Sequence, residues 1–137
     1  MPDLSGSCHC GQVHIAIHTS VEVDAIVLRE CQCGFCRRHG AKTFADPAGE
    51  ASISGSVGLT HYRFGQATAD FLLCSRCGVY VGAVIEHEGR HFATINATGL
   101  QIAPLGTRSA TPVSYEGEDV EARRQRRLDR WMPVVLS

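Results

Sequence analysis

The seven cysteines of this 137-residue chain fall into two spaced sets, and this spacing constrains the fold more than any other feature. Cys8 and Cys10 form a C-x-C pair near the start, and Cys74 and Cys77 form a C-x-x-C pair far downstream. Four sulfurs complete a tetrahedral zinc site. Because the two pairs are far apart in sequence, one ion would join distant segments. The pattern therefore predicts a structural metal site that contributes much of the folding free energy.

The other three cysteines form a C-x-C-x-x-C cluster made of Cys31, Cys33 and Cys36. Three sulfurs leave a tetrahedral zinc one ligand short, and an open position can receive water, a thiol or a substrate. His39 lies three residues after Cys36 and could instead close the site as a structural Cys₃His centre. The chemistry favours the open form, because zinc held by three thiolates suits capture of a soft thiol better than activation of water.

The residues around the cysteines predict their local conformation. In a strand, residues i and i+2 point to the same face, so a C-x-C pair on a strand offers two sulfurs side by side. The residue after a metal knuckle often needs a positive φ, which glycine adopts without strain. Gly11, Gly34 and Gly78 each follow a cysteine directly. We expect these glycines to form the turns of the two sites.

Length and composition place the chain among small intracellular proteins. We expect residues 1–137 to form a single zinc-binding domain. The net charge of -1 provides no field that would attract nucleic acid or a membrane. Residues 1–11 lack the pattern of a signal peptide, and no apolar stretch approaches the roughly 20 residues of a membrane span. We predict a cytoplasmic protein, where clustered cysteines bind metals more often than they form disulfides.

Hydrophobic periodicity predicts a mostly β architecture. Val13, Ile15 and Ile17 alternate with residues suited to solvent, which is the period of a strand with one wet face. The turn His87-Glu88-Gly89 between two apolar runs predicts a hairpin. We expect strands at 13–18, 21–28 (buried and leading into Cys31), 59–64, 69–73, 79–85 and 90–95, a loop at 99–114 and the only helix at 118–131.

The predicted C-terminal helix is rich in arginine, with acidic residues concentrated at its start. Its basic side chains are Arg123, Arg124, Arg126, Arg127 and Arg130. An acidic start and a basic remainder match the helix dipole. We therefore interpret these arginines as a solvated face and not as a nucleic-acid interface. Val120, Leu128 and Trp131 could pack the helix on the body of the domain or on a second subunit, which leaves a homodimer open.

Three cysteine-bearing segments resemble the signatures of a known family. These segments are S-G-S-C-H-C-G-Q-V (5–13), C-Q-C-G-F-C-R-R-H-G (31–40) and F-L-L-C-S-R-C-G (71–78). They look like the motifs of the glutathione-dependent formaldehyde-activating enzymes, a family that includes the centromere protein V-like proteins. The resemblance covers residues 5–95. It implies the fold of a small zinc-bearing β-tent. We expect the core of the domain at about 5–98, followed by a C-terminal loop and helix at 99–137.

The resemblance also implies site residues and an activity. It assigns Cys8, Cys10, Cys74 and Cys77 to a structural zinc, and Cys31, Cys33 and Cys36 to a catalytic zinc. The implied activity is that of a carbon–sulfur lyase, which joins glutathione to formaldehyde and cleaves the adduct. Another thiol or another small aldehyde could replace these substrates. In this interpretation Arg37, Arg38 and Lys42 could pair with glutathione carboxylates, and His39 could carry a proton.

Two alternatives come from other functional classes. The first is a non-catalytic zinc-binding interaction module, in which His39 closes the three-cysteine site and both metals are structural. The second is a methionine sulfoxide reductase on the same fold. That chemistry requires a reactive cysteine outside the metal sites, and the four-plus-three division leaves none.

Overall fold

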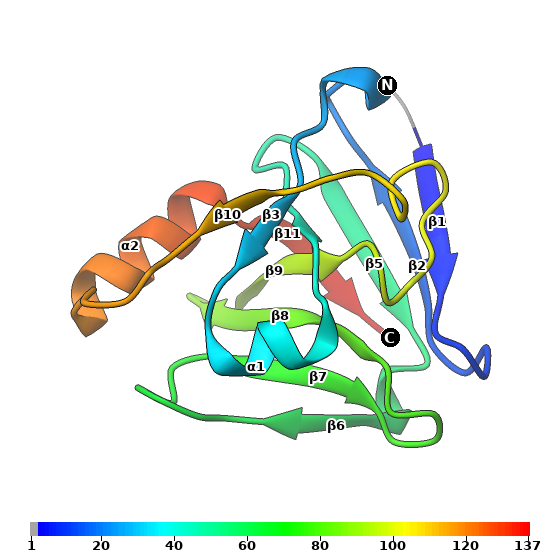
Figure 1. The fold of residues 1–137 in the computed structure, drawn as a ribbon. Coiled ribbons are helices and arrows are strands. Elements are labelled where there is room, and N and C mark those ends of the chain that lie inside the picture. The colour runs from blue at the N-terminus through cyan, green and yellow to red at the C-terminus, as the bar shows by residue number, and fades with distance from the viewer. Residues whose placement is uncertain (1–2) are drawn as a thin grey trace.

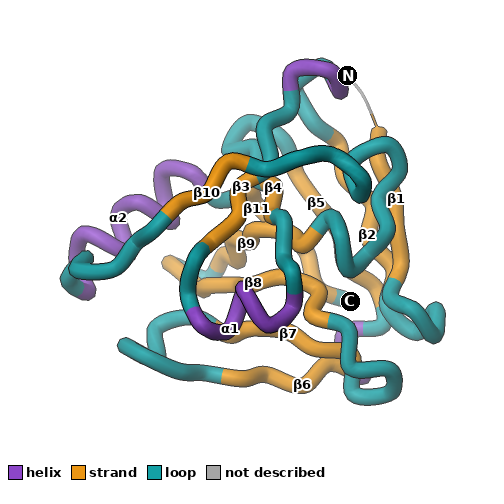
Figure 2. Tube along the Cα trace, in the orientation of Figure 1, coloured by secondary structure: helices purple, strands orange, loops and turns teal. Residues whose placement is uncertain are grey.

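A computed structural model describes residues 3–137, which form a branched sheet of eleven strands and two α-helices (Figure 1). Figure 2 shows that loops make most of the connections around this sheet. The strands are β1 (Asp3–Ser7), β2 (His14–His18), β3 (Arg29–Cys31), β4 (Thr43–Phe44), β5 (Glu50–Ser54), β6 (Leu59–Tyr62), β7 (Asp70–Cys74), β8 (Tyr80–His87), β9 (Arg90–Asn96), β10 (Thr111–Val113) and β11 (Met132–Leu136). The helices are α1 (Gly34–His39) and α2 (Val120–Arg130). The prediction of a mostly β protein with a C-terminal helix is confirmed.

The sheet branches at β9. On one side, β9 pairs with β8, which continues through β7 to β6. On its other side, residues 91–93 pair with β11, whereas residues 95 and 96 pair with β4. From β11 the sheet runs through β5 and β2 to β1, and from β4 it runs through β3 to β10. The two branches therefore separate at Thr94, and this separation opens space inside the fold.

The sheet branch that runs from β11 to β1 shows the alternation of buried and exposed residues that the sequence predicts. In β2, Ile15 and Ile17 are buried, while His14 and His18 are exposed. Gly6 in β1 permits a close approach of the loop that follows β9, because a Cβ there would lie 2.3 Å from the carbonyl oxygen of Leu100. The same carbonyl accepts a 2.9 Å hydrogen bond from the backbone N–H of Ser7.

The predicted hairpin is confirmed as β8 and β9. Glu88 and Gly89 both have positive φ angles, 52° and 76°, as a two-residue turn between antiparallel strands requires. The predicted strands at 59–64 and 69–73 are confirmed as β6 and β7, which pair antiparallel. These strands place the C-x-x-C pair at the end of β7, close to the start of β8.

Two expectations about the first half of the chain are wrong. Residues 21–28 form no strand; instead they contain a 3₁₀ turn, Val23–Ala25, and Val27 is 67% exposed. The guanidinium of Arg108 donates to the carbonyls of Val23 and Ile26, which satisfies backbone groups that a neighbouring strand would otherwise bind. The second error is the short helix α1, which lies in a segment where no helix was expected.

The C-terminal part of the chain contributes two strands to the sheet, β10 and β11. Residues 99–114, expected to be a loop, include β10, and β11 follows the predicted helix to lie between β5 and β9. The hydrophobic core extends past residue 98, the expected limit, and includes Leu100, Ile102, Leu105, Met132 and Val134. No helix among residues 3–137 has the length and apolar character that crossing a bilayer requires.

Candidate metal centres and the adjoining cavities

The sulfurs of Cys8, Cys10, Cys74 and Cys77 lie within 4.8 Å of one another. The first pair lies in the turn between β1 and β2, and the second lies at the end of β7 and in the turn before β8. The C-x-C pair therefore meets through a turn, and the expectation that it lies on a strand is wrong. Gly11, with a φ of 82°, follows Cys10 as predicted.

The donor set of this four-cysteine site fits zinc. Sulfurs at about 2.3 Å from a common tetrahedral ion lie roughly 3.8 Å apart. The Sγ atoms of Cys8 and Cys10 are 3.7 Å apart, and those of Cys10 and Cys74 are 3.6 Å apart. The backbone N–H of Val13 donates to the sulfur of Cys8 at 3.3 Å. Such donors orient a thiolate ligand and stabilise its charge.

Cys31, Cys33 and Cys36 form the second group, whose sulfurs also lie within 4.8 Å of one another. Cys31 ends β3, and Cys33 caps α1 by accepting a 3.3 Å hydrogen bond from the backbone N–H of Cys36. The helical turn carries Cys36 back toward the other two sulfurs. Gly34 does not take the positive φ that was expected, because it is the first residue of α1.

His39 is not a member of this second group. Within residues 3–137, no His, Asp or Glu ligand atom lies within 4.8 Å of all three sulfurs. The exposed His39 ring lies instead against Phe35 and Tyr80, with centroid distances of 4.6 and 5.5 Å. The described residues therefore bring together three cysteine sulfurs that could bind a metal.

The electrostatics of the three-cysteine group favour a thiolate. The adjacent Cys36 thiol lowers the pKa of Cys31 to about 6, and the guanidinium of Arg126 contributes in the same direction. The interaction with Cys31, together with burial, raises the pKa of Cys36. Cysteine binds metals as the thiolate, so a sulfur that ionises below neutral pH suits a metal ligand.

A cavity of about 110 Å³, which we call the inner cavity, adjoins the three-cysteine group. Thr94 lines it at the point where the two sheet branches separate, and Tyr80 and Trp131 are also in its wall. Tyr80 is 2% exposed, and burial together with the nearby cysteines raises the pKa of its phenol well above the usual value. Its hydroxyl is therefore protonated at neutral pH.

A second cavity of about 390 Å³, the outer cavity, adjoins the same group. Cys31 and Cys33 line both cavities, as do three side chains outside the cluster, Phe71, Tyr115 and Arg127. The three-cysteine group thus lies where a small cavity meets a larger one. By contrast, the four-cysteine group lines neither of these cavities.

The basic residues predicted for substrate binding lie elsewhere. Arg37, Arg38 and Lys42 line neither the inner nor the outer cavity. Arg38 donates to the carbonyl of Gly34 at 2.8 Å, and Lys42 donates to the carbonyl of Arg108 at 2.6 Å. The two cavities instead contain arginines of α2, the helix that was interpreted as a solvated face.

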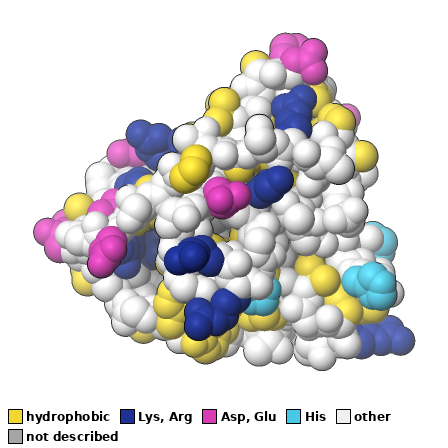
Figure 3. All heavy atoms as spheres, in the orientation of Figure 1, with side chains coloured by type: hydrophobic (Ala, Val, Ile, Leu, Met, Phe, Trp, Pro, Cys, Tyr) yellow, Lys and Arg dark blue, Asp and Glu magenta, His cyan; other side chains and the backbone are white. Residues whose placement is uncertain are grey.

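That interpretation of α2 is wrong for one side of the helix. Arg127 is 8% exposed, and Arg126 and Arg127 both line the inner cavity. Trp131 lies one turn after Arg127 on the same side of the helix. Because tryptophan side chains are usually buried, this residue was the sequence signal that could have placed Arg127 in the interior. On the outer side of α2, acidic and basic side chains are interspersed (Figure 3), and Arg124 pairs with Glu121.

These observations define a small, mostly β protein with two cysteine groups that could bind metal, one of them open to paired cavities. Comparison with known proteins agrees. The family described as glutathione-dependent formaldehyde-activating enzyme matches residues 3–113. The chain belongs to this family, so the resemblance of its three cysteine motifs is confirmed. Membership indicates an enzyme with a glutathione-dependent activity related to formaldehyde.

A solved structure is also similar to this chain. It is the crystal structure of a Rhodobacter sphaeroides protein, with a TM-score of 0.60 and 28% sequence identity. The match covers 80% of this chain and 99% of the Rhodobacter chain. The family match ends at residue 113, so α2, with Arg123, Arg126 and Arg127 of the cavity walls, lies beyond it.

Proposed function

We propose that the protein is a zinc-dependent carbon–sulfur lyase-type enzyme. It would join a thiol, glutathione or a similar compound, to formaldehyde or another small aldehyde, and cleave the adduct in the reverse direction. One observation carries the proposal: three cysteine sulfurs converge beside two cavities, and no fourth ligand from residues 3–137 joins them. The match to the glutathione-dependent family supports the same chemistry.

In this proposal the cysteines bind metals and the two cavities bind the substrates. Cys31, Cys33 and Cys36 would hold the catalytic zinc, and the four remaining cysteines would hold a structural one. When bound at the open site, zinc would stabilise the substrate sulfur as a thiolate near neutral pH. The inner cavity, at about 110 Å³, would hold a small aldehyde. The larger outer cavity, at about 390 Å³, would hold a tripeptide such as glutathione.

The bond changes are those of a hemithioacetal. A sulfur electron pair forms the new carbon–sulfur bond at the carbonyl carbon, and the π electrons of the carbonyl move to its oxygen, which then takes a proton. The two cavities would bring the reactants together, and proximity supplies most of the rate gain. Tyr80, in the wall of the inner cavity, would donate a hydrogen bond to the developing oxyanion.

The proposal is tested by Cys33→Ser. Serine is a good N-cap, so α1 keeps the hydrogen bond that Cys33 now accepts from Cys36, while the metal loses a sulfur ligand. We expect one of two zinc ions to be lost, and thiol–aldehyde condensation above the uncatalysed rate to disappear. Metal analysis and adduct formation followed by NMR measure the two effects. Loss of one zinc with unchanged condensation would exclude the mechanism.

The proposal also assigns the protein to the cytoplasm. All seven cysteines are free thiols, as metal binding requires. A reducing compartment keeps such clusters available for metals, because it opposes disulfide formation.

A further inference from the structure

Arg127 is a buried cation without an anionic partner. Its side chain comes from α2, and the residue is 8% exposed. One terminal nitrogen donates to Oγ1 of Thr68 at 2.9 Å, and the guanidinium carbon lies 5.1 Å from the centre of the Trp131 ring. The Nε atom is buried and has no hydrogen-bond partner. Within residues 3–137, no carboxylate oxygen lies within 4.0 Å of its nitrogens.

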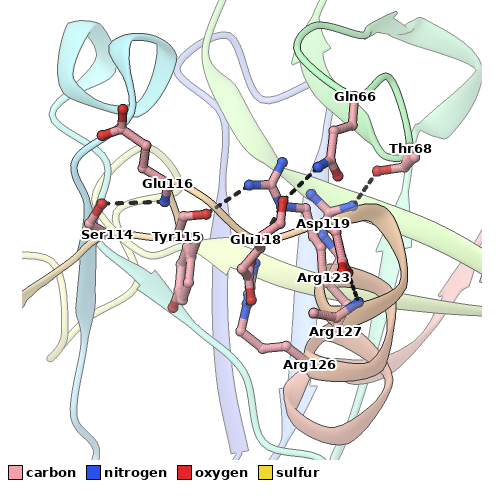
Figure 4. Close-up of polar contacts among 11 residues, drawn as sticks. Gln66, Thr68, Ser114, Tyr115, Glu116, Glu118, Asp119, Arg123, Arg126 and Arg127 are labelled. Carbon is pink, nitrogen blue, oxygen red and sulfur yellow. Dashed lines mark hydrogen bonds and ion pairs between the residues drawn. The ribbon is translucent and has the colours of Figure 1, made fainter.

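The acidic side chain just before α2, Glu118, is already paired with other arginines. Glu118 accepts from Arg123 at 3.2 Å and from Arg126 at 2.9 and 3.0 Å (Figure 4). One carboxylate thus serves two guanidinium groups, and Figure 4 shows Arg127 directed instead toward Thr68. The local charge is therefore positive, with Arg127 as the group that the protein leaves unpaired.

The surroundings of Arg127 indicate where an anion would bind. Arg127 lines both cavities, and in both it is accompanied by Cys31 and Cys33. The inner cavity is also lined by Arg29 and Arg126, and no Asp or Glu contributes to its wall. An unpaired buried charge is costly, and an arginine fork matches the two oxygens of a carboxylate.

We infer that Arg127 binds a carboxylate of a substrate beside the three-cysteine group. This inference rests on the proposed function, because it assigns the anion to one of the two reactants. The carboxylate could belong to the carbonyl substrate in the inner cavity, which would then be an aldehyde acid. It could also belong to glutathione in the outer cavity. The chemistry at Arg127 is the same in both cases, and the choice of probe separates them.

Binding of two unreactive probes tests the inference. Glycolate mimics a small aldehyde acid, and S-methylglutathione mimics the thiol with its sulfur blocked. Isothermal calorimetry on the purified, metal-containing protein should detect at least one of them. Arg127→Gln should weaken that probe about 10- to 100-fold, the range for a hydrogen-bonded charge. Arg124→Gln is the matched control, because Arg124 is an exposed arginine of the same helix and should bind as the unaltered protein does.

A second variant separates loss of the carboxylate contact from misfolding. Arg127→Lys keeps the charge and the alkyl stem but loses the fork, so it should bind the same probe with an affinity between those of the unaltered protein and Arg127→Gln. Loss of glycolate binding alone assigns the carboxylate to the aldehyde, and loss of S-methylglutathione binding alone assigns it to the thiol. Unchanged binding of both probes in folded Arg127→Gln overturns the inference, as does failure of the unaltered protein to bind either probe.

Catalysis is measured separately, so that the two proposals can fail independently. Acetaldehyde and glyoxylate have similar sizes and differ by a methyl group and a carboxylate. If Arg127 binds the aldehyde, Arg127→Gln should reduce condensation of glutathione with glyoxylate about 10-fold or more and leave acetaldehyde unaffected. Arg127-dependent probe binding without any catalysed condensation would support the carboxylate site and refute the proposed function. Reduced zinc content with unchanged probe binding would assign Arg127 to the metal site and overturn the inference.

Discussion

At the scale of single residues, the inner cavity depends on side chains that do not bind metal. Tyr80 is 2% exposed, and its ring packs against Phe35 and Phe71 beside Cys36. A phenol in this position keeps its proton and, in the proposed mechanism, would donate a hydrogen bond to the substrate oxygen without reorganising. Such preorganised donors contribute strongly to reactions that build charge on an oxygen atom.

Tyr80→Phe should therefore lower the catalysed condensation rate about 10-fold or more, after subtraction of the uncatalysed reaction. Zinc content and thermal unfolding should change little, because the ring remains in place. Tyr62→Phe serves as control, since Tyr62 also stacks on Phe35 but is 48% exposed and lines neither cavity. An undiminished rate in Tyr80→Phe would remove the tyrosine from the mechanism.

At the scale of elements, β11 shows how the C-terminal segment completes the fold. Its residues pair in parallel with β5 and antiparallel with β9, so the last strand lies inside the sheet. Pro133 is tolerated there because it lies before Val134, where the pairing with β5 begins. A proline lacks the N–H that a two-sided ladder requires. The strand therefore begins pairing on one side only.

Two adjacent valines of β11 test this placement. Val134 is 6% exposed and Val135 is 65% exposed. Val134→Ala should reduce the free energy of unfolding by roughly 2 kcal/mol, because it leaves a cavity in the core. Val135→Ala should change it by less than about 0.5 kcal/mol. Urea unfolding of the two variants provides the comparison, and equal effects would contradict the register of β11.

The sequence predicts some elements well because their signals are local. The hairpin of β8 and β9 follows from Glu88-Gly89, and β2 follows from the alternation around Ile15. The elements that were missed depend on distant groups. The carbonyls of residues 23 and 26 are satisfied by Arg108, far along the chain. The helix α1 has six residues, too few for a helical period, and depends on its cap, Cys33.

The candidate site divides in the same way. The membership of the two cysteine groups follows from spacing, because a ligand set needs short local motifs. The cavity walls do not follow from spacing, since α2 reaches them only through the packing of Trp131 and Leu128 on the β7–β9 part of the sheet. For this reason the sequence pattern favours Arg37 and Arg38 as substrate-binding residues, whereas Arg126 and Arg127 line the inner cavity in the structure.

At the scale of the whole molecule, the four-cysteine group brings together parts of the chain that are far apart in sequence. A metal bound by these sulfurs would fix the turn after β1 to the turn between β7 and β8. In a domain of this size, a metal that closes so long a loop is a major contribution to stability. Cys8 and Cys74 are buried and Cys77 is partly buried, whereas Cys10 is exposed.

Cys10→Ser isolates the metal contribution because the side chain makes no core packing. An exposed substitution usually changes the free energy of unfolding by less than about 0.5 kcal/mol. If the group binds a structural zinc, the loss should be at least about 3 kcal/mol. His9→Ala, at the exposed neighbouring position, is the control. Thermal unfolding and zinc analysis measure the effect, and a Cys10→Ser protein as stable as the control would refute a structural metal.

In the proposed function, the three-cysteine site binds a metal with room for a substrate thiol. Zinc X-ray absorption spectroscopy of the purified protein, with and without glutathione, measures the sulfur ligands of each zinc ion. We predict two zinc ions that share seven protein sulfurs, in sets of four and three, and an eighth sulfur ligand when glutathione is added. A single zinc ion, or a sulfur count that glutathione does not change, would contradict it.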